Sequence, residues 1–272
     1  MTVIVRTPAP PLDRLVRAIT YQAGEQPQTS VEKILPGPAA SLWVNLNRDG
    51  FRSLGETGRV RTVPGAMLAG PTSRACVIEF EEGRAHVSVV FALGAACRFF
   101  AAPLALFRDE QVALADVWGH VGANLRERLL EAATPGDALG VTEDVLLGQL
   151  TQTVPDPAVR SAACALSQCV PVGEVADGLG LLPRTLRRRF TAQVGLTPKR
   201  FARVRRLQAV VRDLDGQVQA DWAAVAARHG YADQPHLTDE FRELVGVTPA
   251  EYLRARINGP NHLRPAVTWP AD

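Results

Sequence analysis

The sequence predicts an α+β protein built from a β-sandwich domain followed by an all-α domain. Short apolar segments separated by turn residues fill the chain from about residue 30 to residue 91, and helical periodicity takes over after Gly94. At 272 residues, the chain is also long enough for two hydrophobic cores. We therefore expect residues 1–155 to form one domain, residues 156–258 a helical domain, and residues 259–272 a loose tail.

Seven segments in the N-terminal half have the length and composition of β-strands. Each is rich in β-branched or aromatic residues, and turn signals such as Pro-Gly and Asp-Gly separate most of them. They are residues 31–35, 41–46, 51–54, 60–63, 66–69, 76–80 and 86–91. Strands of this length and spacing are typical of a β-sandwich or a small barrel. Ahead of them, the prolines at 8, 10 and 11 and the apolar residues that follow predict a short helix over 8–20.

A helical hairpin is expected to end the N-terminal half. Helical segments at 95–99, 104–107 and 114–119 lead into an amphipathic helix over 117–133, in which apolar residues recur at spacings of three and four. After Thr134-Pro135-Gly136, a second helix is expected over 137–151. The apolar face of this hairpin either forms a dimer interface or packs back on the sheet of its own chain.

One pattern is written twice between Val172 and Tyr252. In each copy a short apolar helix ends at a glycine, Gly180 or Gly230, which can adopt the left-handed conformation of a helix cap. A second helix then follows, and its Phe190 or Phe241 lies four residues after a leucine, so the pair can dock on the first helix. This arrangement predicts two helix-turn-helix motifs.

The starts of the two second helices differ. Pro183 suits the first turn of the first one, but Leu182 offers no capping oxygen. In the other copy Asp233 is the expected N-cap, with Pro235 in the first turn. The faces opposite the docking residues are expected to be polar and free, with Arg184, Arg187 and Arg188 in the first copy and Gln234, His236, Asp239 and Glu240 in the second.

The charge distribution singles out the C-terminal part. Residues 1–157 hold 14 Lys and Arg against 17 Asp and Glu, whereas residues 158–272 hold 16 against 11. No acid occurs between Asp177 and Asp213, and nine basic residues fall within 184–206. This asymmetry favours an anion-binding C-terminal part, of the kind that contacts nucleic acid.

The exposed residue types match what base edges and phosphates require. Arg can read guanine and Gln can read adenine through paired hydrogen bonds in a major groove, while phosphates require positive charge alone. Lys199, Arg200, Arg203, Arg205 and Arg206, on the helix after the first copy, could supply that charge. The expected DNA-binding residues are Arg184, Thr185, Arg187, Arg188, Lys199, Arg203, Arg206, Gln234, Pro235, His236 and Asp239.

The tandem pattern resembles the DNA-binding domain of the AraC/XylS family of bacterial transcription regulators. The resemblance rests above all on Gly230-Tyr-Ala-Asp-Gln-Pro-His-Leu237, with Phe241 and Gly246-Val-Thr-Pro249, and covers about 100 residues. It implies a sequence-specific regulator with two recognition helices in successive major grooves of double-stranded DNA. It also implies that a long helix over about 198–213 joins the two motifs. It further implies that residues 1–155 form a cupin-like regulatory and dimerisation domain. The stretch near Leu114 to Leu129 is similar to an uncharacterised sensor domain of such regulators. The resemblance also implies three other possible partners, which are a small-molecule effector, RNA polymerase and a second copy of the chain.

Other classes of function find less support. The sequence contains no Gly-rich phosphate loop, no Gly-x-Ser-x-Gly and no His-Glu-x-x-His, so we expect neither an enzyme nor a cofactor. His86 is the only histidine in the strand region, which argues against a metal-binding cupin. Trp43, Phe80 and Phe91 either line an effector pocket or form the core. The alternative function is a protein-binding helical module on a β-sandwich scaffold, in which the Arg face is merely solvated.

The location of the protein is inferred from segments that are missing. The chain begins without the charged and apolar regions of a signal peptide, and no apolar run reaches the 18 residues or so of a membrane span. We therefore expect a cytoplasmic protein without a membrane partner. The four cysteines have no metal-ligand spacing and are expected to be free thiols.

Overall fold

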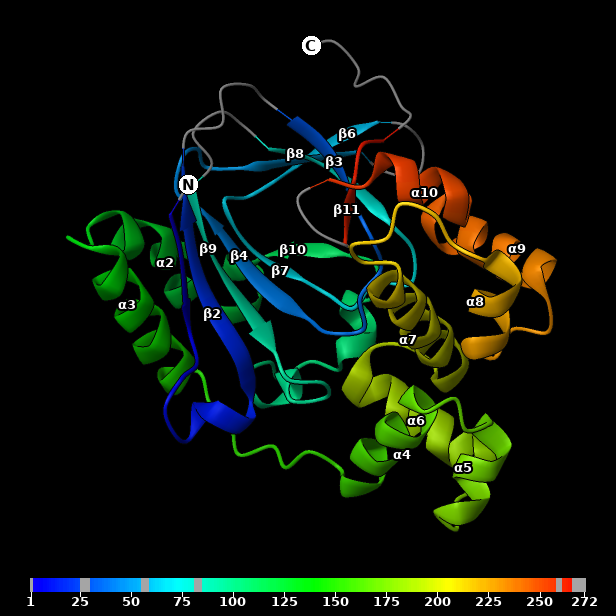
Figure 1. Ribbon diagram of the computed structural model, residues 1–272. Coiled ribbons are helices and arrows are strands. Elements are labelled where there is room, and N and C mark those ends of the chain that lie inside the picture. The colour runs from blue at the N-terminus through cyan, green and yellow to red at the C-terminus, as the bar shows by residue number, and fades with distance from the viewer. Residues whose placement is uncertain (1, 25–29, 55–58, 81–84, 258–260, 266–272) are drawn as a thin grey trace.

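Two antiparallel sheets make up most of the N-terminal part of the computed structural model, which describes residues 2–24, 30–54, 59–80, 85–257 and 261–265 (Figure 1). The first sheet has the order β1 (Thr2–Arg6), β2 (Val16–Ala23), β9 (Ala85–Phe91), β4 (Ser41–Asn45), β7 (Ala66–Ala69) and β10 (Gln111–Ala113). The second has the order β11 (His262–Leu263), β3 (Ser30–Ile34), β8 (Cys76–Phe80), β5 (Phe51–Leu54) and β6 (Val60–Val63).

The alternation of side chains along β4 explains how these layers pack. Leu42 and Val44 are buried and join the main N-terminal core, which lies between the first sheet and a layer of helices. Trp43 points to the opposite face, where it packs against Phe51 and Met67 between the two sheets. Because successive side chains of β4 point to opposite faces of the sheet, this one strand contributes to two apolar layers.

Three helices cover the outer face of the first sheet. They are α1 (Leu114–Trp118), α2 (His120–Leu130) and α3 (Pro135–Gly148), and two short 3₁₀ turns, η2 (Ala96–Arg98) and η3 (Leu104–Phe107), precede them. Leu125 on α2 and Leu139 on α3 are buried in the main core, so the hairpin packs back on its own sheet. A dimer interface on this hairpin stays a prediction. Leu130 and Leu147 are exposed on it and are the apolar side chains available for such a contact.

Among the described residues of the C-terminal part there are seven helices, and they divide between two apolar cores. The helices are α4 (Pro157–Ser167), α5 (Val172–Gly178), α6 (Pro183–Val194), α7 (Pro198–Asp213), α8 (Trp222–Arg228), α9 (Gln234–Val245) and α10 (Pro249–Ala255). The first core includes Phe190 and Phe201, and the second includes Phe241 and Tyr252. Helix α7 contributes Val204 to the first core and Leu207 to the second, so it joins the two motifs as predicted.

The predicted α+β architecture is confirmed, and all seven predicted strands are present, but the segment 8–20 was wrongly predicted as a helix. Only the 3₁₀ turn η1 (Leu12–Arg14) is helical there, and residues from Val16 onward form β2. Val16 and Ile19 are fully buried, and β2 pairs with both β1 and β9. Pairing on both sides outweighs the local helix signal that the prolines gave.

Two smaller predictions also need correction. The expected single helix over 117–133 is divided into α1 and α2, because Gly119 has a φ of 58° and interrupts the helix there. The tail after Gly259 was expected to be loose, but His262 and Leu263 form β11 on the edge of β3. Leu263 is fully buried in the second C-terminal core, which explains why this short segment is ordered. Residues 258–260 and 266–272 of this tail lie outside the described residues. Among the helices described, none is both long and apolar enough to cross a membrane.

Candidate nucleic-acid interface

The first helix-turn-helix motif consists of α5, a turn at Gly180 and α6. Gly180 has a φ of 63°, the left-handed conformation expected at this turn. Leu186 and Phe190 on α6 are fully buried, and the Phe190 ring meets Phe201 of α7 edge-on at 5.2 Å between centroids. The N-cap Leu182 makes no side-chain capping bond, as the sequence predicts.

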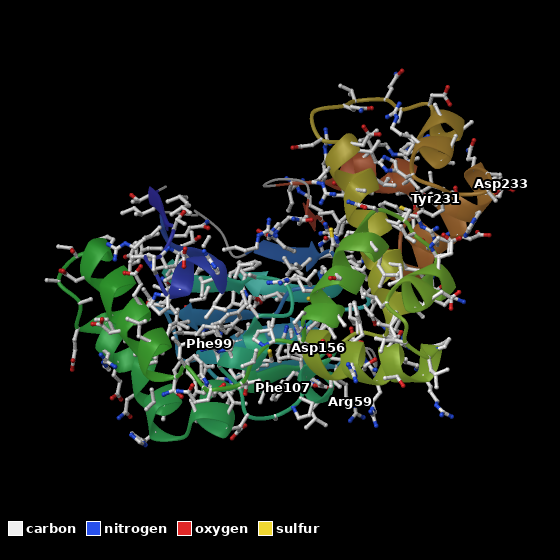
Figure 2. The ribbon with its side chains drawn as sticks, turned by 90° about the horizontal axis from the view of Figure 1, so that it is seen from below. Arg59, Phe99, Phe107, Asp156, Tyr231 and Asp233 are labelled. Atoms are coloured by element: carbon white, nitrogen blue, oxygen red, sulfur yellow. The ribbon has the colours of Figure 1, made fainter. Side chains whose placement is uncertain are left out.

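The second motif repeats this arrangement with α8, Gly230 and α9. Gly230 has a φ of 71°, and Leu237 and Phe241 of α9 are fully buried. The carboxylate of Asp233 caps α9 by accepting a hydrogen bond from the backbone N–H of His236 at 2.8 Å. Figure 2 shows Asp233 and Tyr231 in this motif, far from Phe99 and Phe107 of the N-terminal part.

The exposed face of α6 lies along an open groove. Arg184, Arg187 and Arg188 are exposed, and Thr185 is half-buried. Together with Lys199 at the start of α7, the three arginines line a groove of about 940 Å³. Its other wall belongs to the N-terminal part and includes Arg108, so the basic face of α6 continues onto that part of the chain.

The exposed face of α9 is less basic. Gln234, Pro235, His236 and Asp239 are all exposed there. The His236 ring meets Tyr231 edge-on at 5.3 Å, which fixes its position at the start of the helix. A second groove, of about 620 Å³, runs between the two motifs and is lined by residues from both, among them Lys199, Arg203, Arg206 and His236. The structure thus brings Lys199, Arg203, Arg206 and His236 together in this groove and the three arginines of α6 in the other. Thr185, Gln234, Pro235 and Asp239 are not among the residues that line either groove.

Glu240 is not on the free face of α9, where the sequence analysis placed it. Its side chain is 7% exposed, and its carboxylate accepts hydrogen bonds from Arg203 Nε at 2.8 Å and from Arg206 Nη2 at 2.7 Å. Arg203 also pairs with Glu243, one helical turn further along α9. We refer to Arg203, Arg206, Glu240 and Glu243 as the α7–α9 clamp.

The clamp fixes α9 against the joining helix. Arg206 also donates to the carbonyl of Gly230 at 3.3 Å, and its guanidinium lies 4.3 Å from the centre of the Tyr231 ring. The hydrogen bonds that Arg203 donates to Glu243 raise the pKa of Arg203, and they lower the pKa of Glu243. Two of the four arginines expected to contact phosphate, Arg203 and Arg206, therefore hold the turn and the second helix of the second motif.

Sequence reasoning missed this clamp, although a signal for it was present. Arg203 and Arg206 are three residues apart on α7, and Glu240 and Glu243 are three residues apart on α9, so each pair lies on one helix face. Opposite charges at matched spacing on two helices predict an inter-helix ion pair once the helices are known to be adjacent.

Both motifs are docked on the N-terminal part. Gln193 of α6 donates to the carbonyl of Gly94 at 3.2 Å, and Ala75 donates to the carbonyl of Leu244 of α9 at 2.8 Å. Leu35, which follows β3, is buried in the core of the second motif, next to Leu263 of β11. The orientation of the two motifs is therefore set by the N-terminal part as well as by α7.

Comparison with known proteins identifies the helical part. Residues 175–255 match the model of a helix-turn-helix domain family. These residues run from α5 to α10 and contain both motifs, the joining helix and the clamp. Residues 175–255 are thus similar to the helix-turn-helix domain of AraC-type regulators. Residues 5–113 match a domain family of unknown function, DUF6597. The sequence analysis placed the similarity to a sensor domain near Leu114 to Leu129, and this match ends just before that stretch.

Individual relatives of the AraC-type domain are distant. The HTH-type transcriptional regulator Rv1931c of Mycobacterium tuberculosis (strain ATCC 25618 / H37Rv) is 31% identical over 84 residues, which cover 31% of this chain and 32% of that protein. ToxT from Vibrio cholerae aligns over 87% of this chain and 98% of its own, with a TM-score of 0.48 and 11% identity. The AraC-like transcriptional activator CuxR aligns over 76% of this chain and 86% of its own, with a TM-score of 0.29 and 15% identity. Both structural similarities are too weak to support a conclusion about function.

The N-terminal residues that were considered for a ligand or a metal belong to packed layers. Phe91 is fully buried, Phe80 is 7% exposed, and Trp43 lies against the His86 ring at 5.0 Å. These aromatic side chains therefore form core. Among the described residues, no three His, Cys, Asp or Glu side chains are grouped so that they could hold a metal ion.

Proposed function

We propose that this chain is a sequence-specific DNA-binding transcriptional regulator that inserts α6 and α9 into successive major grooves. One observation carries the proposal: each helix buries its apolar face in the motif and keeps a polar face exposed for contact with a partner. A major groove admits one α-helix, and two helices joined by α7 suit two turns of one duplex. The AraC-type match over residues 175–255 supports the same function.

The exposed residues divide into base readers and phosphate contacts. On α6 we assign base reading to Arg184, Arg187 and Arg188, supported by Thr185. One guanidinium group can donate two hydrogen bonds to the edge of a guanine. On α9 we assign it to Gln234, His236 and Asp239, with Pro235 in contact with the same groove. Lys199, which is exposed at the start of α7, is assigned to phosphate.

Arg203 and Arg206 are given a different role from the one that their charge suggests. Their guanidinium groups are engaged by Glu240 and Glu243, so most of their charge is neutralised inside the protein. We propose that they position α9 for DNA and contribute little to phosphate binding. Measured salt slopes should then reflect fewer phosphate contacts than the nine basic residues of 184–206 would give.

We further propose that the N-terminal part regulates DNA binding, because it contacts both motifs directly. Binding of an effector that changes these contacts would change the relative positions of α6 and α9. Contact with RNA polymerase and pairing of two chains through the hairpin of α2 and α3 are further proposals, which the AraC-type domain makes reasonable.

Selection from a random duplex pool tests the function directly. Full-length protein should enrich a motif with two blocks about one helical turn apart, and its affinity should fall steeply between two salt concentrations. Enrichment of two copies of this motif in one DNA would indicate that the protein binds as a dimer. No enrichment, either by the full chain or by residues 156–258 alone, would contradict DNA binding and favour the protein-binding module.

A further inference from the structure

The groove of about 940 Å³ along α6 is lined by cationic side chains from two parts of the chain. They are Arg108, Arg184, Arg187, Arg188 and Lys199. Arg108 directly follows η3 in the N-terminal part, and the other four belong to α6 and α7. Among the described residues that line this groove, none is Asp or Glu. The groove therefore presents a positive surface to which both parts of the chain contribute.

Little of this charge is neutralised within the protein. In the part of the chain that the structure describes, the three arginines of α6 and Lys199 form no ion pair. Arg108 has one, because its Nε lies 3.6 Å from a carboxylate oxygen of Asp109, and both side chains are partly exposed. The Asp109 carboxylate also accepts hydrogen bonds from the backbone N–H and the hydroxyl of Ser73, at 2.5 and 2.8 Å. A long, solvent-exposed pair with a carboxylate that is shared in this way leaves the Arg108 guanidinium available to an anion in the groove.

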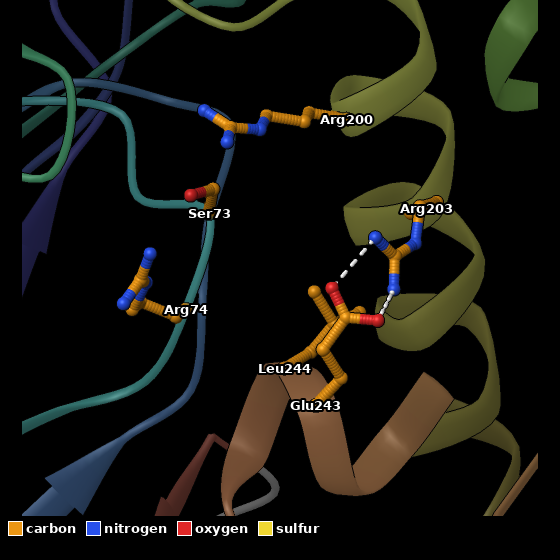
Figure 3. A pocket seen from close by; sticks show the side chains of 6 residues that line it. All are labelled: Ser73, Arg74, Arg200, Arg203, Glu243 and Leu244. Atoms are coloured by element: carbon orange, nitrogen blue, oxygen red, sulfur yellow. Dashed lines mark hydrogen bonds and ion pairs between the residues drawn. The ribbon is translucent and has the colours of Figure 1, made fainter. Parts of the chain in front are cut away.

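The arginines further along α7 differ in this respect. Figure 3 shows Arg203 joined to Glu243 of α9 by two hydrogen bonds, which are 3.0 and 2.5 Å long. Arg206 is paired with the buried Glu240. Close pairs of this kind neutralise charge inside the protein, whereas the cations along the groove remain accessible to a polyanion.

The position of the groove suits the backbone of a duplex. A helix that enters a major groove lies between the two phosphate backbones that border that groove. One backbone must therefore pass beside α6, and η3 is in contact with α6. Both α6 and α7 begin at this groove, with Pro183 and Pro198 in its lining, so the positive ends of two helix dipoles add to the charge there.

We infer that one phosphate backbone of double-stranded DNA lies in this groove, and that Arg108 of the N-terminal part binds one of its phosphates. This inference rests on the proposed function and extends the DNA contact beyond the helical part. Lys199 and Arg108, on opposite walls, hold the backbone between them while α6 reads the bases. A guanidinium group binds a phosphate through charge-assisted hydrogen bonds.

Salt titrations of DNA binding by the full chain test this contact. The loss of one phosphate contact reduces the slope of log K against log salt by about 0.9. We expect this smaller slope for Arg108→Gln, and binding about fivefold weaker at ~0.15 M salt, for the selected site and for a random duplex alike. Arg61→Gln is the matched control, because Arg61 lies outside the lining of this groove and also pairs with a neighbouring carboxylate, that of Glu110, at 3.6 Å. It should change the affinity less than about twofold.

Arg108→Lys separates a phosphate contact from a structural role. It keeps the charge and should restore the wild-type slope, because a phosphate requires positive charge alone. Equal slopes for Arg108→Gln and Arg61→Gln would overturn the inference, and so would tighter binding by Arg108→Gln, which would mean that the N-terminal part keeps DNA away from α6. Both of these results leave the proposed function intact. If the wild-type chain binds neither duplex, the proposed function and this inference are both wrong.

Discussion

Arg184 and Arg188 lie four residues apart on the exposed face of α6, where a helix in a major groove presents its side chains to base edges. Their environment is solvent and the open groove, so neither has to break a buried contact before it meets DNA. Thr185 and Arg187 share the helix surface beside them. The residues with the greatest freedom to read sequence are therefore those of α6 rather than those of α7.

Removing one of these guanidinium groups should reduce sequence preference. Arg184→Ala or Arg188→Ala is expected to weaken binding to the selected site by about 1–3 kcal/mol if the residue makes a bidentate base contact. Binding to random DNA should change much less. Competition titrations with both DNAs measure the difference, and equal losses on both would mean that the arginine touches only phosphate.

Glu240 has the opposite character, because it is buried and holds two arginines at once. Glu240→Gln removes the charge that pairs with Arg203 and Arg206, and breaking a buried ion pair from one side costs about 3–5 kcal/mol. The matched control is Glu243→Gln. The Glu243 side chain is 65% exposed and paired on the surface, so its loss should cost less than about 1 kcal/mol.

Hydrogen exchange along α9 distinguishes these two variants. We expect faster exchange of the α9 amides in Glu240→Gln and near wild-type exchange in Glu243→Gln. Equal exchange in the two variants would mean that burial of Glu240 contributes nothing to the position of the second recognition helix.

Whole elements carry the stability of each motif. Phe190 and Phe241 occupy equivalent positions on α6 and α9 and are both fully buried, but each belongs to a different core. Phe190→Ala and Phe241→Ala should each cost about 3–5 kcal/mol. Exchange should accelerate in α4–α6 for the first variant and in α8–α10 for the second. Val218→Ala, at a side chain 88% exposed, is the control and should change stability by less than about 0.5 kcal/mol.

The sequence was most informative where a local signal coincides with the structural cause. Gly180, Gly230 and Asp233 predicted turns and a cap that the structure contains, because left-handed φ values and N-cap bonds depend on a few adjacent residues. The strands between residues 31 and 91 were equally readable from their alternation and their turns. In contrast, β2 and β11 depend on partners far along the chain, and so does the buried state of Glu240. No local pattern contains that information alone, and the matched spacing of charges on α7 and α9 predicts the clamp only once the two helices are known to be adjacent.

At the scale of the whole molecule, Gly195 is where the first motif meets the N-terminal part. It ends α6 in the left-handed conformation, with a φ of 87°. A Cβ at this position would lie 2.8 Å from Pro71 Cγ and 3.0 Å from the Leu104 carbonyl oxygen, both across the interface. Gly180 provides a matched comparison, since its φ is 63° but a Cβ there would meet nothing within 4 Å.

These two glycines allow docking to be separated from backbone strain. Gly195→Ala and Gly180→Ala should both cost about 1–2 kcal/mol, because an L-residue is forced into the left-handed region. Only Gly195→Ala should also push the N-terminal part away, since Pro71 and the backbone at Leu104 must move to make room. We therefore expect faster hydrogen exchange in residues 69–76 and 103–108 for Gly195→Ala alone, together with a larger radius of gyration in solution scattering. The same exchange pattern and the same radius of gyration in the two variants would mean that the docking of α6 on the N-terminal part does not constrain the molecule. The proposal that the N-terminal part regulates DNA binding through its contact with α6 would then be wrong.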